Sequence, residues 1–101
     1  MKRYEITLEY WDIDGIFDPA SDDFFEWALA NPNGCYASEI IASFDTKEEA
    51  LAKLASYKCS YEKLENYNET RFELYAVEEL IYDEDGDIED YRFIQYADIE
   101  I

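Results

Sequence analysis

The chain contains no histidine, and its 101 residues include only two cysteines, two prolines, three glycines and eight basic side chains. The missing histidine removes the commonest general base and the commonest neutral metal ligand, which excludes Ser-His and Cys-His catalysis and most zinc sites. Cys35 and Cys59 follow no metal-binding or redox spacing. We therefore expect two reduced thiols that fill small apolar spaces, no cofactor and no enzymatic activity.

Long apolar runs are also missing. The first ten residues alternate between polar and apolar types, and no run approaches the length needed to cross a membrane. Neither a signal peptide nor a transmembrane helix is predicted, so the expected compartment is the cytoplasm. Almost half of the residues are hydrophobic and 18% are aromatic, which argues against disorder. We expect one folded domain over residues 1–101.

Positive charge is scarce, and negative charge is abundant. There are 26 carboxylates against 8 bases, a formal net charge of −18. Such a chain repels nucleic acids and anionic membranes and attracts basic surfaces. We expect no direct binding to nucleic acid or to a membrane. The expected partner is a basic protein, for example a nuclease.

The first half of the chain predicts two strands and a short helix. Residues 3–11 alternate, with Tyr4, Ile6, Leu8 and Tyr10 on the apolar side and Arg3, Glu5, Thr7 and Glu9 on the other. Ser21 is a candidate N-cap for a helix whose apolar side is Phe24, Phe25, Trp27, Ala28 and Leu29. The turn formers of residues 31–34 end that helix, and residues 36–44 predict a second strand.

A second helix begins directly after this strand. Thr46 and Glu49 have the spacing of a capping box, in which the Thr46 hydroxyl accepts from the amide of Glu49 and the Glu49 carboxylate returns to the amide of Thr46. Apolar residues continue at spacings of three and four at Ala50, Leu54, Tyr57, Tyr61 and Leu64. This stripe predicts a helix to about Glu65 and leaves room for a break near residues 59–60.

The last third of the chain predicts a long β-hairpin. Residues 70–82 and 88–101 are rich in aromatic and β-branched types, and Asp85-Gly86 suits a two-residue type I′ turn. In that register the numbers of paired residues sum to 171. The pairs are then Leu80 with Tyr91, Glu78 with Phe93, Ala76 with Gln95, Leu74 with Ala97 and Phe72 with Ile99. Apart from Glu78 and Gln95, their face can pack on a core. A three-residue loop would shift this register.

The order of elements is strand, helix, strand, helix, strand, strand. It predicts an α+β fold of two layers. A four-stranded, mainly antiparallel sheet would carry both helices on one face, with the C-terminal hairpin turning at Asp85-Gly86.

Two local patterns resemble known motifs. Asp12-Ile13-Asp14-Gly15-Ile16 resembles the Asp-x-Asp-Gly-Thr loop of haloacid dehalogenase-type phosphatases, but Ile16 replaces the threonine and the chain is too short for the rest of that fold. Residues 83–89 alternate carboxylates as calcium loops do, yet Gly86 is fourth rather than sixth and predicted strands flank it. We interpret both segments as turns and expect no metal site.

The remaining feature is an acidic segment interleaved with aromatics, because residues 78–100 hold ten carboxylates against one base. Same-face residues on a strand lie roughly 7 Å apart, a spacing close to that of phosphates along a nucleic acid. The chain resembles, in size, charge and tyrosine content, the small acidic DNA-mimicking inhibitors used against restriction or CRISPR nucleases. The candidate contact residues are Glu73, Tyr75, Glu78, Glu79, Tyr82, Asp83, Glu84, Asp85, Asp87, Glu89, Asp90 and Tyr96.

That resemblance implies an inhibitor that occupies a basic nucleic-acid-binding surface. An immunity protein or antitoxin that neutralises a basic toxin is the alternative from the same physical logic. A small non-catalytic structural domain, with its charge serving solubility, is the alternative from a different class.

Overall fold

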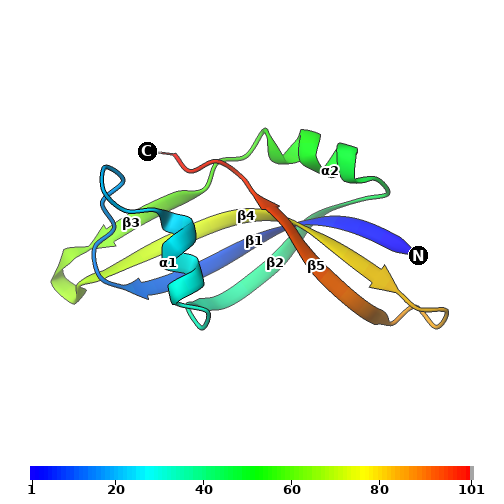
Figure 1. The fold of residues 1–101 in the computed structure, drawn as a ribbon, viewed down its shortest axis with the longest axis horizontal. Coiled ribbons are helices and arrows are strands. Elements are labelled where there is room, and N and C mark those ends of the chain that lie inside the picture. Colours follow the sequence, from blue (N-terminus) through cyan, green and yellow to red (C-terminus); the bar gives the residue numbers. More distant parts are fainter. Residues whose placement is uncertain (101) are drawn as a thin grey trace.

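The computed structural model describes residues 1–100 and shows mostly β structure, in one curled sheet (Figure 1). The two helices are short. The elements are β1 (Lys2–Asp14), α1 (Phe24–Ala30), β2 (Cys35–Phe44), α2 (Lys47–Leu54), β3 (Ser60–Leu64), a 3₁₀ turn (Glu65–Tyr67), β4 (Glu69–Tyr82) and β5 (Ile88–Tyr96). The predicted two-layer α+β sandwich with a four-stranded sheet is therefore wrong.

The missed strand is β3, which lies in the segment assigned to the second helix. Helix α2 ends at Leu54, where the Ser56 hydroxyl donates to the carbonyl of Lys53 (2.7 Å). The spacing of Tyr61 and Leu64 fits a helix, but β3 pairs instead with residues 69–73 of β4. A left-handed Asn68 (φ 51°) closes the tight connection between the two strands. Pairing with β4 overrides the local helical pattern.

β4 organises the sheet. One of its edges pairs antiparallel with β1 from Glu69 to Ile81, and β2 pairs with the far side of β1. The other edge is shared, because β3 pairs with residues 69–73 and β5 with residues 76–82. The first half of β4 therefore lies between β1 and β3, and the second half lies between β1 and β5.

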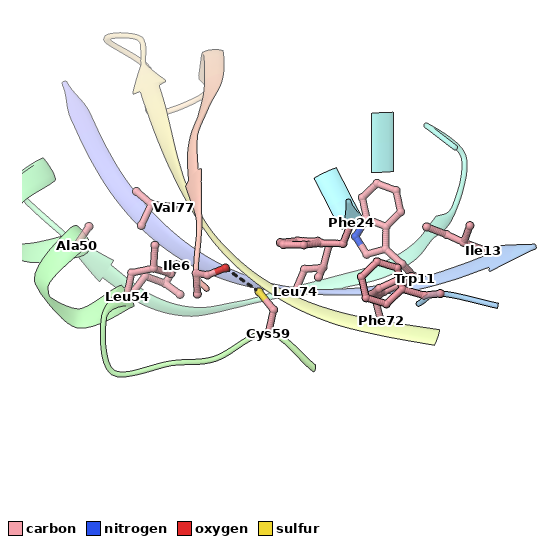
Figure 2. Packing of buried hydrophobic residues seen from close by; sticks show 12 residues of the cluster. Ile6, Trp11, Ile13, Phe24, Ala50, Leu54, Cys59, Phe72, Leu74 and Val77 are labelled. Atoms are coloured by element: carbon pink, nitrogen blue, oxygen red, sulfur yellow. Dashed lines mark hydrogen bonds between the residues drawn. The ribbon is translucent and has the colours of Figure 1, made fainter. Parts of the chain in front are cut away.

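Cys59 lies beside β4 between the residues that pair with β3 and the residues that pair with β5. Its side chain is fully buried, and its sulfur accepts from the amide of Tyr75 (3.3 Å) and donates to the carbonyl of Ala97 (3.3 Å; Figure 2). Its backbone bonds to Asp98 (2.8 Å) and Glu100 (2.7 Å). The thiol is free and buried, as the sequence predicted, and it also completes the hydrogen bonding of the sheet.

The two helices cover opposite faces of the sheet, so their predicted placement on one face is wrong. Trp11 lies opposite Phe72, and Ile6 opposite Val77. Since side chains alternate along a strand, these two pairs point to opposite faces. Phe24 of α1 packs in the cluster near Trp11, whereas Ala50 and Leu54 of α2 lie near Ile6 (Figure 2).

We call the face that carries α1 the inner face, because the strands bend around it (Figure 2). Antiparallel partners share a face, so the inner face comprises the odd-numbered residues of β1 and the even-numbered residues of β4. The face that carries α2 is the outer face. The core therefore changes sides along the sheet, which no single alternating pattern describes.

The C-terminal hairpin exists, but its turn has three residues instead of two. The amide of Gly86 donates to the carbonyl of Asp83 (3.2 Å), and the amide of Asp83 donates to the carbonyl of Asp87 (2.9 Å). Gly86 has a φ of +84° whereas Asp85 has no positive φ, which indicates a type I turn followed by a glycine bulge. The type I′ turn at Asp85-Gly86 is wrong.

The predicted register survives only in the centre of the hairpin. The longer loop pairs Tyr82 with Ile88, and an irregularity after that pair restores the predicted pairs from Ile81–Asp90 to Glu78–Phe93. A second shift then pairs Val77 with Gln95 and Ala76 with Tyr96. The pairs predicted beyond these are wrong, because β5 ends at Tyr96 and β3 occupies that edge of β4. Ile101, the predicted end of the hairpin, lies outside the described residues.

The helix starts agree only in part with the sequence. Asp23, not Ser21, caps α1, and its carboxylate accepts from the amides of Phe25 (2.9 Å) and Glu26 (3.4 Å). At α2 the amide of Glu49 donates to the Thr46 hydroxyl (3.2 Å), as predicted. The Glu49 carboxylate accepts from that same hydroxyl (3.0 Å) instead of from the amide of Thr46.

Candidate functional site on the hairpin tip and the inner face

The predicted contact residues are distributed over three regions. Six carboxylates gather on the exposed tip of the β4–β5 hairpin: Asp83, Glu84, Asp85, Asp87, Glu89 and Asp90. Glu78, Tyr82 and Tyr96 point to the inner face, whereas Glu73, Tyr75 and Glu79 point to the outer face. The structure therefore unites half of the predicted set and separates the rest.

The six tip carboxylates form no ion pairs in the described part of the chain. One Asp83 oxygen accepts from the amides of Asp85 (2.9 Å) and Asp87 (3.0 Å), which shapes the loop. The remaining carboxylates are exposed and available to a partner.

The outer-face members of the predicted set have structural contacts. Glu79 is 4% exposed and pairs with Arg92 (3.1 Å) and Lys2 (3.8 Å). Burial opposes ionisation of Glu79, but the two cations hold the pKa of its carboxyl below the usual value. Tyr75 stacks on Tyr57 at a ring separation of 4.6 Å. These contacts stabilise the sheet and leave little of Glu79 accessible.

The inner face holds carboxylates that the sequence pattern placed on the solvent side of the first strand. Glu5 and Glu9 are 6% and 8% exposed, and Glu78 lies directly opposite Glu5. The expectation of an exposed side was wrong because the sheet curls around this face and aromatic side chains of β1, β4 and β5 cover it (Figure 2). The sequence contained one sign of this burial. Trp11 is a large apolar residue at an odd-numbered position, so it lies on the same face of the strand as Glu5 and Glu9.

Aromatic side chains supply the hydrogen bonds to these carboxylates. The Trp11 indole N–H (3.0 Å) and the Tyr96 hydroxyl (3.3 Å) donate to Glu9, and the Tyr82 hydroxyl donates to Glu5 (3.3 Å). Burial raises the pKa of Glu9, although the bonds from Trp11 and Tyr96 oppose the rise. Burial also raises the pKa of Glu78, and repulsion from Glu9 and Glu5 adds to it.

Thr7 lies on β1 between Glu5 and Glu9 and has no polar partner. The residue is 7% exposed, and its hydroxyl makes no hydrogen bond within the described chain. Its cross-strand neighbour on β4 is Ala76, which is fully buried and has no polar side-chain group to offer the hydroxyl. A buried hydroxyl without a partner costs about 1–3 kcal/mol, so this position is unfavourable in the isolated chain.

Aromatic rings of β5 border the same region. Tyr96 pairs with Ala76, and its ring centre lies 4.6 Å from that of Phe93. Phe93, opposite Glu78, is 48% exposed. Towards the hairpin tip, an open cavity of about 860 Å³ is lined by residues that include Glu5, Tyr82 and Arg3. Arg3 is engaged there by Asp45 and by the Ser43 hydroxyl (2.9 Å).

The segment Asp12-Ile13-Asp14, which the sequence placed after the first strand, belongs to β1. Asp12 lies in β1 and pairs with Arg71 of β4 (3.0 Å). The amide of Gly15 donates to the carbonyl of Asn68 (2.7 Å), which ties the end of β1 to the start of β4. In residues 1–100, no three acidic, cysteine or histidine side chains converge into a possible metal site. No helix in this range has the length and apolarity required to span a membrane.

Comparison with known proteins found no matching protein family, no matching curated protein and no matching solved structure.

Proposed function

We propose that the protein is an acidic inhibitor that occupies the basic nucleic-acid-binding surface of a nuclease or another DNA-processing enzyme. The observation that carries this proposal is the cluster of six exposed carboxylates on the hairpin tip, none of which forms an ion pair within residues 1–100. A basic groove attracts such a cluster and gains little from a neutral surface.

The overall charge density supports the same function. The molecule measures 49 × 25 × 19 Å, so 18 net negative charges along the longest axis amount to one per about 2.7 Å. Duplex DNA carries one charge per about 1.7 Å of axis, and each of its strands one per about 3.4 Å. The protein therefore has a linear charge density between those of a single strand and a duplex.

The position of the tip also suits insertion into a groove. The β4–β5 loop lies at one end of the long axis (Figure 1). The two strands that support it are fixed in the centre of the hairpin by regular pairing from Glu78–Phe93 to Ile81–Asp90. A rigid support reduces the entropy lost when the tip binds.

The test is a titration against a panel of purified restriction and CRISPR nucleases that cleave a labelled duplex. We expect stoichiometric inhibition of a target enzyme, relief by excess competitor DNA, and loss of affinity as salt rises. A tip variant with Glu84→Gln, Asp87→Asn, Glu89→Gln and Asp90→Asn should slow association more than it speeds dissociation.

The control has the same change in net charge at other exposed positions: Glu26→Gln, Glu48→Gln, Glu62→Gln and Glu65→Gln. Inhibition should survive in this variant. Equal losses in both variants would show that only net charge matters, and binding that is indifferent to DNA on the enzyme would exclude mimicry.

A further inference from the structure

Strand β5 lies at an edge of the sheet, and one of its sides is open. It pairs with β4 on one side, and within residues 1–100 no strand pairs with its other side. Residues 90–93 form the regular part of the pairing with β4, between two irregularities. The N–H and C=O groups on the open side of such a strand can form hydrogen bonds with another extended chain.

Exposed aromatic side chains lie along this edge. Tyr91 is 67% and Phe93 48% exposed, and both point to the inner face, because their partners on β4 are even-numbered. The ring of Phe93 lies 4.6 Å from that of Tyr96, which in turn lies 5.7 Å from the ring of Phe25 in α1. A strand added at this edge would therefore place its apolar side chains beside exposed rings.

The charge along the edge favours a basic partner. Asp90 forms no ion pair in the described residues, and the other tip carboxylates come directly before it in the chain. Arg92 is the one base of residues 78–100, and its guanidinium pairs with Glu79 (3.1 Å). A second copy of this chain would bring more carboxylates to the same place and be repelled, whereas a basic strand would be attracted.

The edge strand at the other side of the sheet lacks this combination. Within the described residues β2 also pairs on one side only, and its Tyr36 and Ile40 side chains are both 62% exposed. Glu39 is the only charged residue of β2, however, so a basic strand would gain less attraction there. β2 therefore serves as an internal control for β5.

From these observations we propose that the open side of β5 binds an extended segment of the basic partner, in which apolar and basic residues alternate, as an added strand of the sheet. The apolar side chains of that segment pack beside Tyr91 and Phe93 on the inner face. Its basic side chains lie on the outer face, where Asp90 points. The inference deepens the proposed function and rests on it, because it names the form in which the partner contacts the strand next to the hairpin tip.

The test uses a blocked peptide of alternating lysine and valine, about as long as β5, titrated into the full chain and followed by amide NMR. Saturable shifts and slower hydrogen exchange are expected at residues 90–93, because the added strand satisfies backbone groups there. Binding should weaken as salt rises. The same peptide with prolines in place of two valines keeps its charge but cannot form the strand ladder, so it should not bind. A peptide of alternating glutamate and valine should not bind either.

Two substitutions locate the site. Phe93→Ser should weaken binding of the lysine–valine peptide by up to about fivefold, since it removes one cross-strand apolar contact. Ile40→Ser removes an exposed apolar side chain from β2 and should leave binding unchanged. Both variants should keep the circular dichroism spectrum of the parent chain, because both side chains are largely exposed.

Absence of binding, shifts centred on β2, equal binding of the proline peptide, or equal losses in the Phe93→Ser and Ile40→Ser variants would overturn the inference. The peptide titration needs no nuclease. Nuclease inhibition without peptide binding would therefore remove this inference alone. Peptide binding at β5 without inhibition of any nuclease would instead refute the proposed function and leave the β5 site in place.

Discussion

Replacing Glu78 with glutamine should stabilise the fold at pH 7, because the change removes one of two carboxylates that face each other across β1 and β4. The side chain lies opposite Glu5 and is influenced by Glu9, and no cation pairs with it in residues 1–100. Like charges directly opposite each other in a sheet cost about 0.2–1 kcal/mol. A Coulomb term at about 5 Å and an effective dielectric constant of 20 gives about 3 kcal/mol as an upper value.

We therefore expect a gain of about 1 kcal/mol in the free energy of unfolding, or about 4–8 °C in Tm for a domain of this size. Thermal unfolding followed by circular dichroism measures the shift. Glu65→Gln is the matched control, since it removes one exposed carboxylate without a buried neighbour. Its effect should stay within about 0.5 kcal/mol.

The gain should depend on pH in a defined direction. The folded pKa of Glu78 is raised above its ordinary value of 4.5, so the folded state binds this proton more tightly than the unfolded state does. The repulsion is therefore complete above the folded pKa and is removed as the pH falls below the unfolded value. The advantage of glutamine should be largest at pH 7 and vanish near pH 4. A lower Tm at pH 7, or an equal gain at both pH values, would refute the reasoning.

Three further predictions concern the hairpin tip and the buried thiol. Gly86→Val should lower the free energy of unfolding by about 1 kcal/mol or more in urea titrations, because Gly86 has a φ of +84°, which a β-branched residue resists. An added Cβ would meet no neighbour, so the cost comes from the backbone alone. An equal cost for Gly86→Asn would contradict this. Asp83→Ala should destabilise the loop by about 1 kcal/mol because it removes the acceptor for two amides, whereas Asp83→Asn should be nearly neutral in the same titrations. In the native state a thiol reagent should modify Cys59 roughly 1000-fold more slowly than Cys35, since Cys59 is reached only by extensive opening; equal rates without denaturant would exclude its burial.

Local patterns predicted several elements correctly. The alternation of residues 3–11 identified β1, and the Thr46–Glu49 spacing located the start of α2. The centre of the hairpin has the predicted pairs because neighbouring strands joined by a short loop have few alternative registers. These features depend on residues close together in the sequence.

Long-range pairing decided what local patterns could not. The segment of β3 has spacings that fit a helix, and only β4 makes it a strand. The sharing of one β4 edge by β3 and β5 also ended the hairpin early, at Tyr96. Sequence spacing says nothing about competition between two segments for one edge.

For the candidate site, the sequence by itself determined the acidic excess and the six carboxylates of the hairpin tip, because a charged turn between two strands is exposed wherever the hairpin packs. Only the tertiary structure decided that Glu5, Thr7 and Glu9 are buried. An alternating strand has two equivalent faces until its neighbours cover one or both of them. Here the curl of the sheet and the aromatic side chains of Trp11, Tyr82 and Tyr96 cover the inner face, while α2 covers the outer face, so the polar side of β1 became a largely buried acidic surface.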